Sequence, residues 1–256
     1  MSEHDHPYRL GYRVTPQLRR IREEEVFRTA DREREELLTA RRSARSQQLW
    51  HVAQDCPQPL RDWVIRYFLN HYPLPLSPVE TLADLAEQIT EDVIIHRIGN
   101  GRDWMAYGDV SLPSGWRPEE KIGRSFQEIH LPVAGMQLER SFELIRSVVR
   151  NGPFERFVWS ILFSREWNGH PDRLKPEFDP DSPKLVVKVE RQVLVGCPEH
   201  EMVLFLLHHQ LIPRAQVDLA ALLRAVEGMS EEQRQYKGLT KSWPPLRDWM
   251  QSQVSP

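Results

Sequence analysis

The chain has 256 residues, of which 40% are hydrophobic and 28% charged, and its formal net charge is -3. A chain of this length and composition can bury one large core or two small ones. The near-neutral charge argues against a nucleic-acid-binding protein, and only two cysteines, Cys56 and Cys197, argue against a disulfide framework or a cysteine-rich zinc site.

The sequence has no run of 18 apolar residues, and its start, MSEHDHPYRL, has no apolar core after a basic stretch. We therefore expect a cytoplasmic protein with neither a membrane nor a nucleic acid as partner.

The first third of the chain is predicted to be helical. After a tail at residues 1–14, residues 15–48 are rich in arginine and glutamate, which is typical of one or two exposed helices whose charges face solvent. Apolar residues at helical spacing predict a second helix over 59–71, and 81–87 reads as a short amphipathic helix. We expect residues 15–80 to pack on the rest of the chain as an extra helical segment.

Strand signals dominate from residue 93 onward. A hairpin is predicted around Gly99, Asn100 and Gly101, and Pro118 and Gly123 are placed to begin and end a short helix. Further predicted elements follow in chain order: a helix over 137–150, strands over 157–163, 184–195 and 202–207, and helices over 217–228 and 244–250. Residues 81–256 thus read as an α+β core with an antiparallel sheet flanked by helices.

Arg191 interrupts the apolar odd-numbered face of the strand over 184–195. An arginine on a buried face stays charged and needs an anionic partner. That partner is either a carboxylate of the protein or an anion of a ligand, and the sequence leaves both open.

His130 lies among apolar residues in EIHLPVAG, where Pro132 favours an extended course. A neutral imidazole there can bind iron or transfer protons, although a hydrogen-bonded core histidine fits the same pattern. His208 and His209 should point to opposite faces of their strand, which argues against a two-histidine metal site. Trp104, Trp116 and Trp159 are candidates for the wall of a flat apolar pocket, or for core packing.

Common catalytic motifs are missing from the sequence. It contains no HExxH, GxSxG, GxGxxG or Walker-type loop, which removes the usual hydrolase, dinucleotide and nucleotide interpretations.

The run DWMAYGDVSLPSGWRPEEKIGRSFQEIHLPVAG resembles the central block of the haem-dependent oxidative N-demethylase alpha-subunit-like family. The segments DREREELL, FVWSILF, KVERQVL and QYKGL resemble further family motifs, in the same order along the chain. The resemblance implies a PAS-like fold that binds haem b and its iron. It also implies oxidation of a small methylamine to a primary amine and formaldehyde, with flavin and iron-sulfur proteins as electron donors.

Carried over to this sequence, the resemblance makes His130 the candidate axial ligand of the iron and Arg191 a candidate partner of a haem propionate. Arg117 and Lys121 are further propionate candidates, and Trp116 is a candidate pocket residue. The chain departs from the family pattern at a few positions: Asp109, Ser111, Val158, Val193 and the segment LLHHQ at 206–210.

Three functions follow from this reading. The first is a haem-dependent oxidoreductase acting on an N-methyl group of a small amine. The second is a non-catalytic haem or small-ligand sensor, because a fold does not fix a function. The third is an interaction module that docks a partner through its arginine-rich N-terminal helix.

Overall fold

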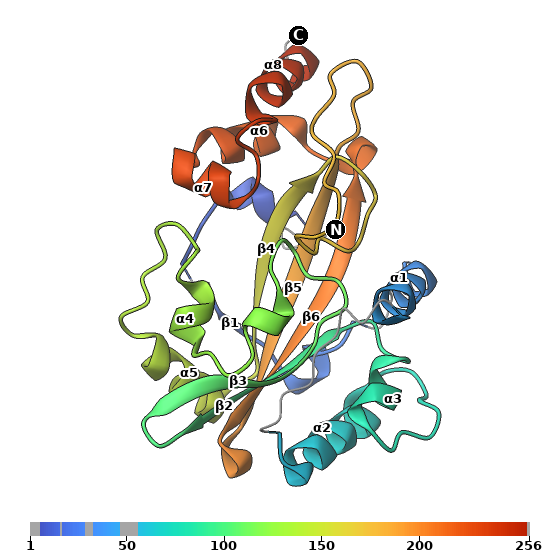
Figure 1. The fold of residues 1–256 in the computed structure, drawn as a ribbon, viewed down its shortest axis with the longest axis vertical. Coiled ribbons are helices and arrows are strands. Elements are labelled where there is room, and N and C mark those ends of the chain that lie inside the picture. The colour runs from blue at the N-terminus through green and yellow to red at the C-terminus, as the bar shows by residue number, and fades with distance from the viewer. Residues whose placement is uncertain (1–5, 16, 29–32, 47–55, 255–256) are drawn as a thin grey trace.

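The computed structural model describes residues 6–15, 17–28, 33–46 and 56–254. Its centre is one six-stranded antiparallel sheet with the strand order β1-β4-β5-β6-β2-β3. Helices pack on both faces of this sheet (Figure 1). The predicted α+β class, with an antiparallel sheet flanked by helices, is confirmed.

The predicted hairpin is formed by β2 (Asp92–Gly99) and β3 (Arg102–Asp109). Its two-residue turn places Asn100 at φ 50° and Gly101 at φ 75°. Both angles are positive, as the tight turn between two twisted strands requires, and asparagine and glycine are the residues that accept them most readily.

The long strands are β4 (Phe154–Leu162), β5 (Val186–Cys197) and β6 (Met202–Pro213), which pair in that order. The other edge of β6 pairs with β2, so the first hairpin lies beside the last strand. Both faces of β5 are buried, including Lys188 and Glu190 at even positions. Helices or loops therefore cover each side of this strand.

One face of the sheet, carrying Arg191 and Val193, is covered at one end by α2 (Gln58–His71) and α3 (Leu82–Ala86). At the other end it is covered by η2 (Pro7–Leu10), α6 (Leu219–Glu227) and α8 (Trp243–Val254). The predicted helices at 59–71, 81–87, 217–228 and 244–250 are all present.

The opposite face is covered by α4 (Phe126–His130) and α5 (Ser141–Asn151). Helix α5 approaches β5 so closely that a Cβ at Gly196 would lie 2.3 Å from the carbonyl oxygen of Val148. Glycine is required there because any larger residue would push the helix off the sheet. The 3-10 helix η4 (Pro118–Glu120) and Gly123, at φ 78°, form the short helix and stop that we predicted.

The N-terminal region differs from its prediction. Residues 15–28 contain the two-residue strand β1 (Arg19–Arg20) and the 3-10 helix η3 (Glu23–Glu25), and helix α1 spans only Arg34–Ser46. Tyr8, expected in a tail, is fully buried against Trp159. Arg41 on α1 is 1% exposed, so this helix packs on the sheet instead of presenting all its charges to water. Of the predicted helical segment 15–48, residues 16, 29–32, 47 and 48 lie outside the described residues.

Two short helices and two 3-10 turns were also not predicted. His130 ends the short helix α4, although Pro132 had suggested an extended course, and α7 (Glu231–Tyr236) follows α6. Two 3-10 turns, η5 (Pro198–His200) and η6 (Arg214–Gln216), flank β6. Within the described ranges, none of the helices has the length and apolar character needed to span a bilayer.

Candidate ligand cavity

A cavity of about 670 Å³ lies on the sheet face that α4 and α5 cover. Its volume is within the range of small-molecule and cofactor sites. Its floor is formed by alternate residues of β4 and β5, its sides by α4 and the loops after β3 and β4, and one end by the end of α7. The floor carries an unusual row of polar side chains: Arg156 and Ser160 from β4, and Lys188, Glu190 and Gln192 from β5.

His130 is on the wall of this cavity, at the last residue of α4. Its Nδ1 lies 2.8 Å from the carbonyl oxygen of Phe126, and its ring stacks on the Phe126 ring with 3.9 Å between centroids. A carbonyl accepts only, so Nδ1 carries the proton and Nε2 keeps its lone pair. Burial lowers the pKa of His130 to about 4, against the opposing effect of the bond to Phe126. The imidazole is therefore neutral at physiological pH and has a lone pair to offer to a metal.

The position of α4 is fixed by two contacts at its start. The Ser125 side chain caps the helix by accepting from the Glu128 backbone N–H. On β3, the buried carboxylate of Asp103 accepts the Phe126 backbone N–H at 2.6 Å and also bonds His96 Nε2. Because Phe126 orients His130, Asp103 indirectly holds the imidazole.

The structure brings four of the five predicted cofactor-contacting residues to the same cavity. Trp116, Arg117, Lys121 and His130 all line it. The guanidinium of Arg117 forms two hydrogen bonds with the carboxylate of Asp172, one of them 2.8 Å long. Burial lowers the pKa of Lys121, and the nearby charge of Arg124 lowers it further.

Arg191, the fifth, lies on the opposite face of the sheet. Its Nε donates to Glu155 at 2.7 Å, and its terminal nitrogens donate to the carbonyl oxygens of Val26 at 2.7 Å and Glu25 at 2.6 Å. Of the two partners left open by the sequence, the structure provides the protein carboxylate. We therefore no longer expect Arg191 to contact a ligand in the cavity.

Several cavity residues were missed by sequence reasoning. Glu190 and Gln192 flank Arg191 in the family-like motif KVERQVL, and Tyr236 and Lys237 belong to QYKGL. Both motifs were recognised, but only Arg191 was singled out, since it interrupts an apolar face. The alternation on β5 sends its two polar neighbours to the cavity side. Arg156 belongs to none of the recognised motifs and interrupts no apolar pattern, so the sequence did not single it out.

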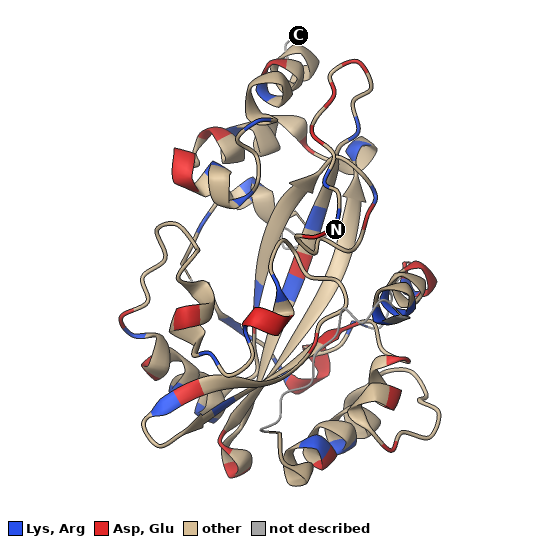
Figure 2. Cartoon of the chain, viewed as in Figure 1, with Lys and Arg blue, Asp and Glu red and all other residues tan. Residues whose placement is uncertain are grey.

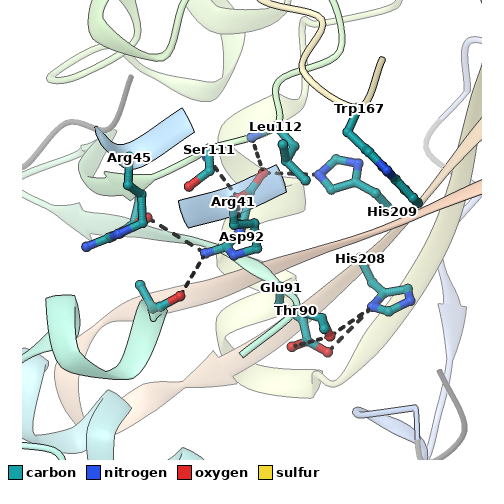
Figure 3. Close-up of polar contacts among 12 residues, drawn as sticks. Arg41, Arg45, Thr90, Glu91, Asp92, Ser111, Leu112, Trp167, His208 and His209 are labelled. Carbon is teal, nitrogen blue, oxygen red and sulfur yellow. Dashed lines mark hydrogen bonds and ion pairs between the residues drawn. The ribbon is translucent and has the colours of Figure 1, made fainter. Parts of the chain in front are cut away.

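A buried polar network joins α1 to the strands β2 and β6 (Figure 3). At its centre is Asp92 on β2, which pairs with Arg41 and accepts the backbone N–H groups of Ser111 at 2.9 Å and Leu112 at 3.2 Å. His209 Nε2 lies 3.1 Å from Asp92, and its Nδ1 lies 3.8 Å from Glu190. Burial alone would raise the pKa of Asp92, but the charge of Arg41 and the bond to His209 hold it at about 2.

The neighbouring contacts extend this network to positions where the chain departs from the family pattern. Arg45 pairs with Asp109, and His208 on the other face lies 3.7 Å from Glu91. The predicted opposite orientation of His208 and His209 is confirmed by these partners. The anchoring of α1 by Arg41 and Arg45 to its own sheet is a different role from the partner docking that the sequence had suggested for this helix.

Among the residues that the structure describes, no three histidine, cysteine, aspartate or glutamate side chains are grouped as a metal cluster would need.

The comparisons with known proteins give one family. The family model described as "Haem-dependent oxidative N-demethylase, alpha subunit-like" matches residues 25–247. No curated protein matches the chain. The matched region contains the strands β2 to β6 and the part of the cavity wall that carries His130, Trp116 and Lys121. Because the match covers most of its length, the chain belongs to the haem-dependent oxidative N-demethylase alpha-subunit-like family.

Proposed function

We propose that this protein binds haem b in the cavity, where His130 would hold the iron. The observation that carries the proposal is the bond from His130 Nδ1 to the Phe126 carbonyl. A metal-binding histidine normally donates its second ring N–H to such an acceptor, which fixes its tautomer and makes the other nitrogen a better ligand. A single imidazole suffices as a protein ligand for haem iron.

The other walls of the cavity fit a flat, partly apolar, anionic group. Trp116, Phe126 and Ile129 offer apolar surface, and Lys121 offers a positive charge to a carboxylate. The PAS-like fold is part of the proposal. It is supported by the order β4-β5-β6-β2-β3 of the five long strands, in which the first hairpin adjoins the last strand.

The function we propose is that of a haem-dependent oxidoreductase that oxidises the N-methyl group of a small amine and releases formaldehyde. When bound, haem supplies the oxidative chemistry. Of this chain's residues, Phe126 and Asp103 would orient His130, and α4 and α5 cover one side of the cavity by packing on the sheet. Glu190, on the cavity floor, supplies a carboxylate that can hold an ammonium group or take up a proton. Electron delivery by a flavin or iron-sulfur protein belongs to the same proposal.

The test measures haem uptake by the purified protein through the Soret absorbance band. Wild type is expected to show the band, and His130→Ala to shift it or lose it. His71→Ala is a matched control. His71 Nδ1 lies 2.8 Å from the carbonyl oxygen of Tyr67, four residues earlier, and its ring stacks on Tyr67 in the same way, but on α2 at the other face of the sheet. Equal spectra for all three proteins would refute the assignment of His130.

A second candidate function is a non-catalytic haem or small-ligand sensor. It is favoured by Val158, which stands on the cavity floor beside Glu190 where the family pattern has asparagine, so the cavity has lost a polar group. The reduced, haem-loaded protein would be mixed with air and a set of methylamines. Formaldehyde would support the enzyme, and haem binding without formaldehyde would favour the sensor.

A further inference from the structure

Arg156 is the least satisfied charged residue on the cavity floor. It lies on the cavity face of β4, opposite Gln192 on β5. Its Nε is buried and has no hydrogen-bond partner in the described part of the chain. Burial lowers the pKa of Arg156, with Glu190 opposing the shift, yet an arginine does not lose its proton in a protein. A guanidinium with donors to spare is therefore directed at the cavity.

Lys237 brings a second cation to the same end of the cavity. It follows α7 directly, and its Nζ donates to the Trp159 carbonyl oxygen at 2.9 Å. The ammonium lies 5.3 Å from the centre of the Tyr12 ring and 5.7 Å from that of Tyr236. Burial lowers the pKa of Lys237 to about 8, and the nearby charge of Arg156 adds to this effect. One of the three ammonium protons is taken by the carbonyl, which leaves two for a ligand.

The carboxylates of the cavity do not neutralise these two cations. Glu190 acts on both at a distance, but its oxygens accept from Ser114 Oγ at 3.1 Å and from Gln192. It also faces a third cation, Lys188, whose Nζ is held by the carbonyl oxygens of Leu112 and Trp167. Figure 2 shows positive and negative residues following one another along the central strands.

The remaining acidic residues on the cavity wall are engaged elsewhere. Glu155 pairs with Arg191, Glu120 lies 3.5 Å from Arg117, and Glu166 accepts from the backbone of Asn168. Positive charge in a partly buried site is costly unless an anion is close to it. The cavity floor therefore carries more cations than carboxylates paired with them, and an anionic ligand would balance this charge.

We propose that Arg156 and Lys237 form a subsite that binds a carboxylate group inside the cavity. A carboxylate can accept from the planar guanidinium and from the ammonium at the same time, through charge-assisted hydrogen bonds. The carboxylate belongs either to a haem propionate or to a separate small molecule, such as an N-methylated amino acid. The first source rests on the proposed haem binding, whereas the second does not.

The first arm of the test compares haem with its dimethyl ester, which lacks the propionate charges, by absorbance titration. The proteins are wild type, Arg156→Met, Lys237→Met and the control Arg150→Met, which removes an exposed arginine of α5. If the source is a propionate, wild type binds haem about 10- to 100-fold more tightly than the ester. Arg156→Met and Lys237→Met reduce that ratio, and Arg150→Met keeps it.

The second arm uses calorimetry with N-methylglycine, and with methylamine as the probe without a carboxylate, on the protein with and without haem. If the source is a separate molecule, only N-methylglycine binds, and Arg156→Met weakens its binding about tenfold or more. Far-ultraviolet circular dichroism of each variant checks that the chain is folded, and Lys237→Met replaces any Arg156 variant that is not.

The outcomes distinguish the two proposals. A protein that takes up haem and its ester equally well, and binds N-methylglycine no better than methylamine, has haem but no carboxylate subsite, and the inference is overturned. A protein that takes up no haem but binds N-methylglycine through Arg156 keeps the subsite and loses the proposed haem function.

Discussion

Asp92 and Arg41 form an ion pair from which water is excluded, with side chains 0% and 1% exposed. The pair joins β2 of the sheet to α1, which the sequence had placed on the surface. In a buried ion pair each charge stabilises the other, which offsets the cost of removing both from water. Removing one partner leaves the remaining buried charge without that compensation.

We therefore expect Asp92→Asn to be strongly destabilising. The amide keeps the size of the side chain but not its charge, so Arg41 loses its hydrogen-bonded counterion and keeps only Asp109, 3.8 Å away. The cost should be about 3–5 kcal/mol in the free energy of unfolding. Urea denaturation followed by circular dichroism measures it. Glu87→Gln is the control, because that carboxylate is 47% exposed where it pairs with Arg45, and its loss should cost no more than about 1 kcal/mol. A cost below that of the control for Asp92→Asn would contradict the role of the pair.

The same carboxylate gives the protein a defined sensitivity to acid. The pKa of Asp92 is held at about 2 in the folded chain and is near 3.9 in an unfolded one. The unfolded state thus binds the proton first as the pH falls, and the stabilisation that is complete above pH ~4 is lost progressively down to pH ~2. The free energy of unfolding of wild type should fall faster over this window than that of Asp92→Asn. Parallel pH profiles would show that another carboxylate is responsible.

His130 should remain neutral through the acidic range in the ligand-free protein. Because burial lowers its pKa to about 4, its ring resonances should titrate near pH 4 and not near 6.5, the value of a free histidine. An NMR titration of the His130 ring, assigned by its loss in His130→Ala, measures the midpoint. The lowered pKa also affects stability. Between pH ~6.5 and ~4 the histidine of the unfolded state binds a proton that the folded state does not, so the contribution of His130 makes the fold less stable as the pH falls. A midpoint above 6 would show that the imidazole is not buried as described.

Much of the sheet could be predicted from sequence, because its signals are local. The turn depends only on Asn100 and Gly101, and the spacing that predicts α2 recurs every three or four residues within the helix. Helix α4 was missed because its five residues depend on the capping of Ser125 and on Asp103, which lies 23 residues before Phe126. A contact between distant segments leaves no periodic trace in the sequence.

The cavity residues that the sequence predicted came from two kinds of signal. Arg117 and Lys121 came from the resemblance, whereas His130, Trp116 and Trp159 also stood out by their own residue types, and the structure brings all five to the cavity. Arg191 was chosen for a sound reason, since a buried arginine does need an anion, but its carboxylate is Glu155, on the neighbouring strand. Nothing in the sequence states which strands are neighbours, so Arg156 and Lys237, whose roles depend on β4 and α7 meeting at one cavity, could not be found.

Asp103→Asn should weaken haem binding without touching the haem site directly. The carboxylate accepts from both Phe126 N–H and His96, and Phe126 in turn orients His130. Loss of such an indirect support costs about 10- to 100-fold in metal affinity at comparable sites. Absorbance titration with haem measures this, and the Soret position should stay that of wild type, since the ligand is unchanged. An Asp84→Asn variant, which alters an exposed capping carboxylate on the other side of the sheet, should bind haem as wild type does. Identical affinities for Asp103→Asn and wild type would remove Asp103 from the site.

Arg191 should matter for folding and not for ligand binding. Arg191→Met leaves the Glu155 carboxylate buried with only Arg19 beside it, and leaves the carbonyl oxygens of Val26 and Glu25 without their donors. The expected cost is about 3–5 kcal/mol in the free energy of unfolding. Less should be lost when Glu155→Gln is added, because the double variant has no unpaired buried charge and Arg19, which also loses its partner, is half exposed. At a temperature where the variants are folded, their affinity for haem should equal that of wild type within about twofold, since the guanidinium is on the face of the sheet away from the cavity. Denaturation and absorbance titration of the same samples measure both quantities. A variant that keeps its stability but loses haem would restore Arg191 as a ligand contact, and would mean that Glu155 is not its main partner.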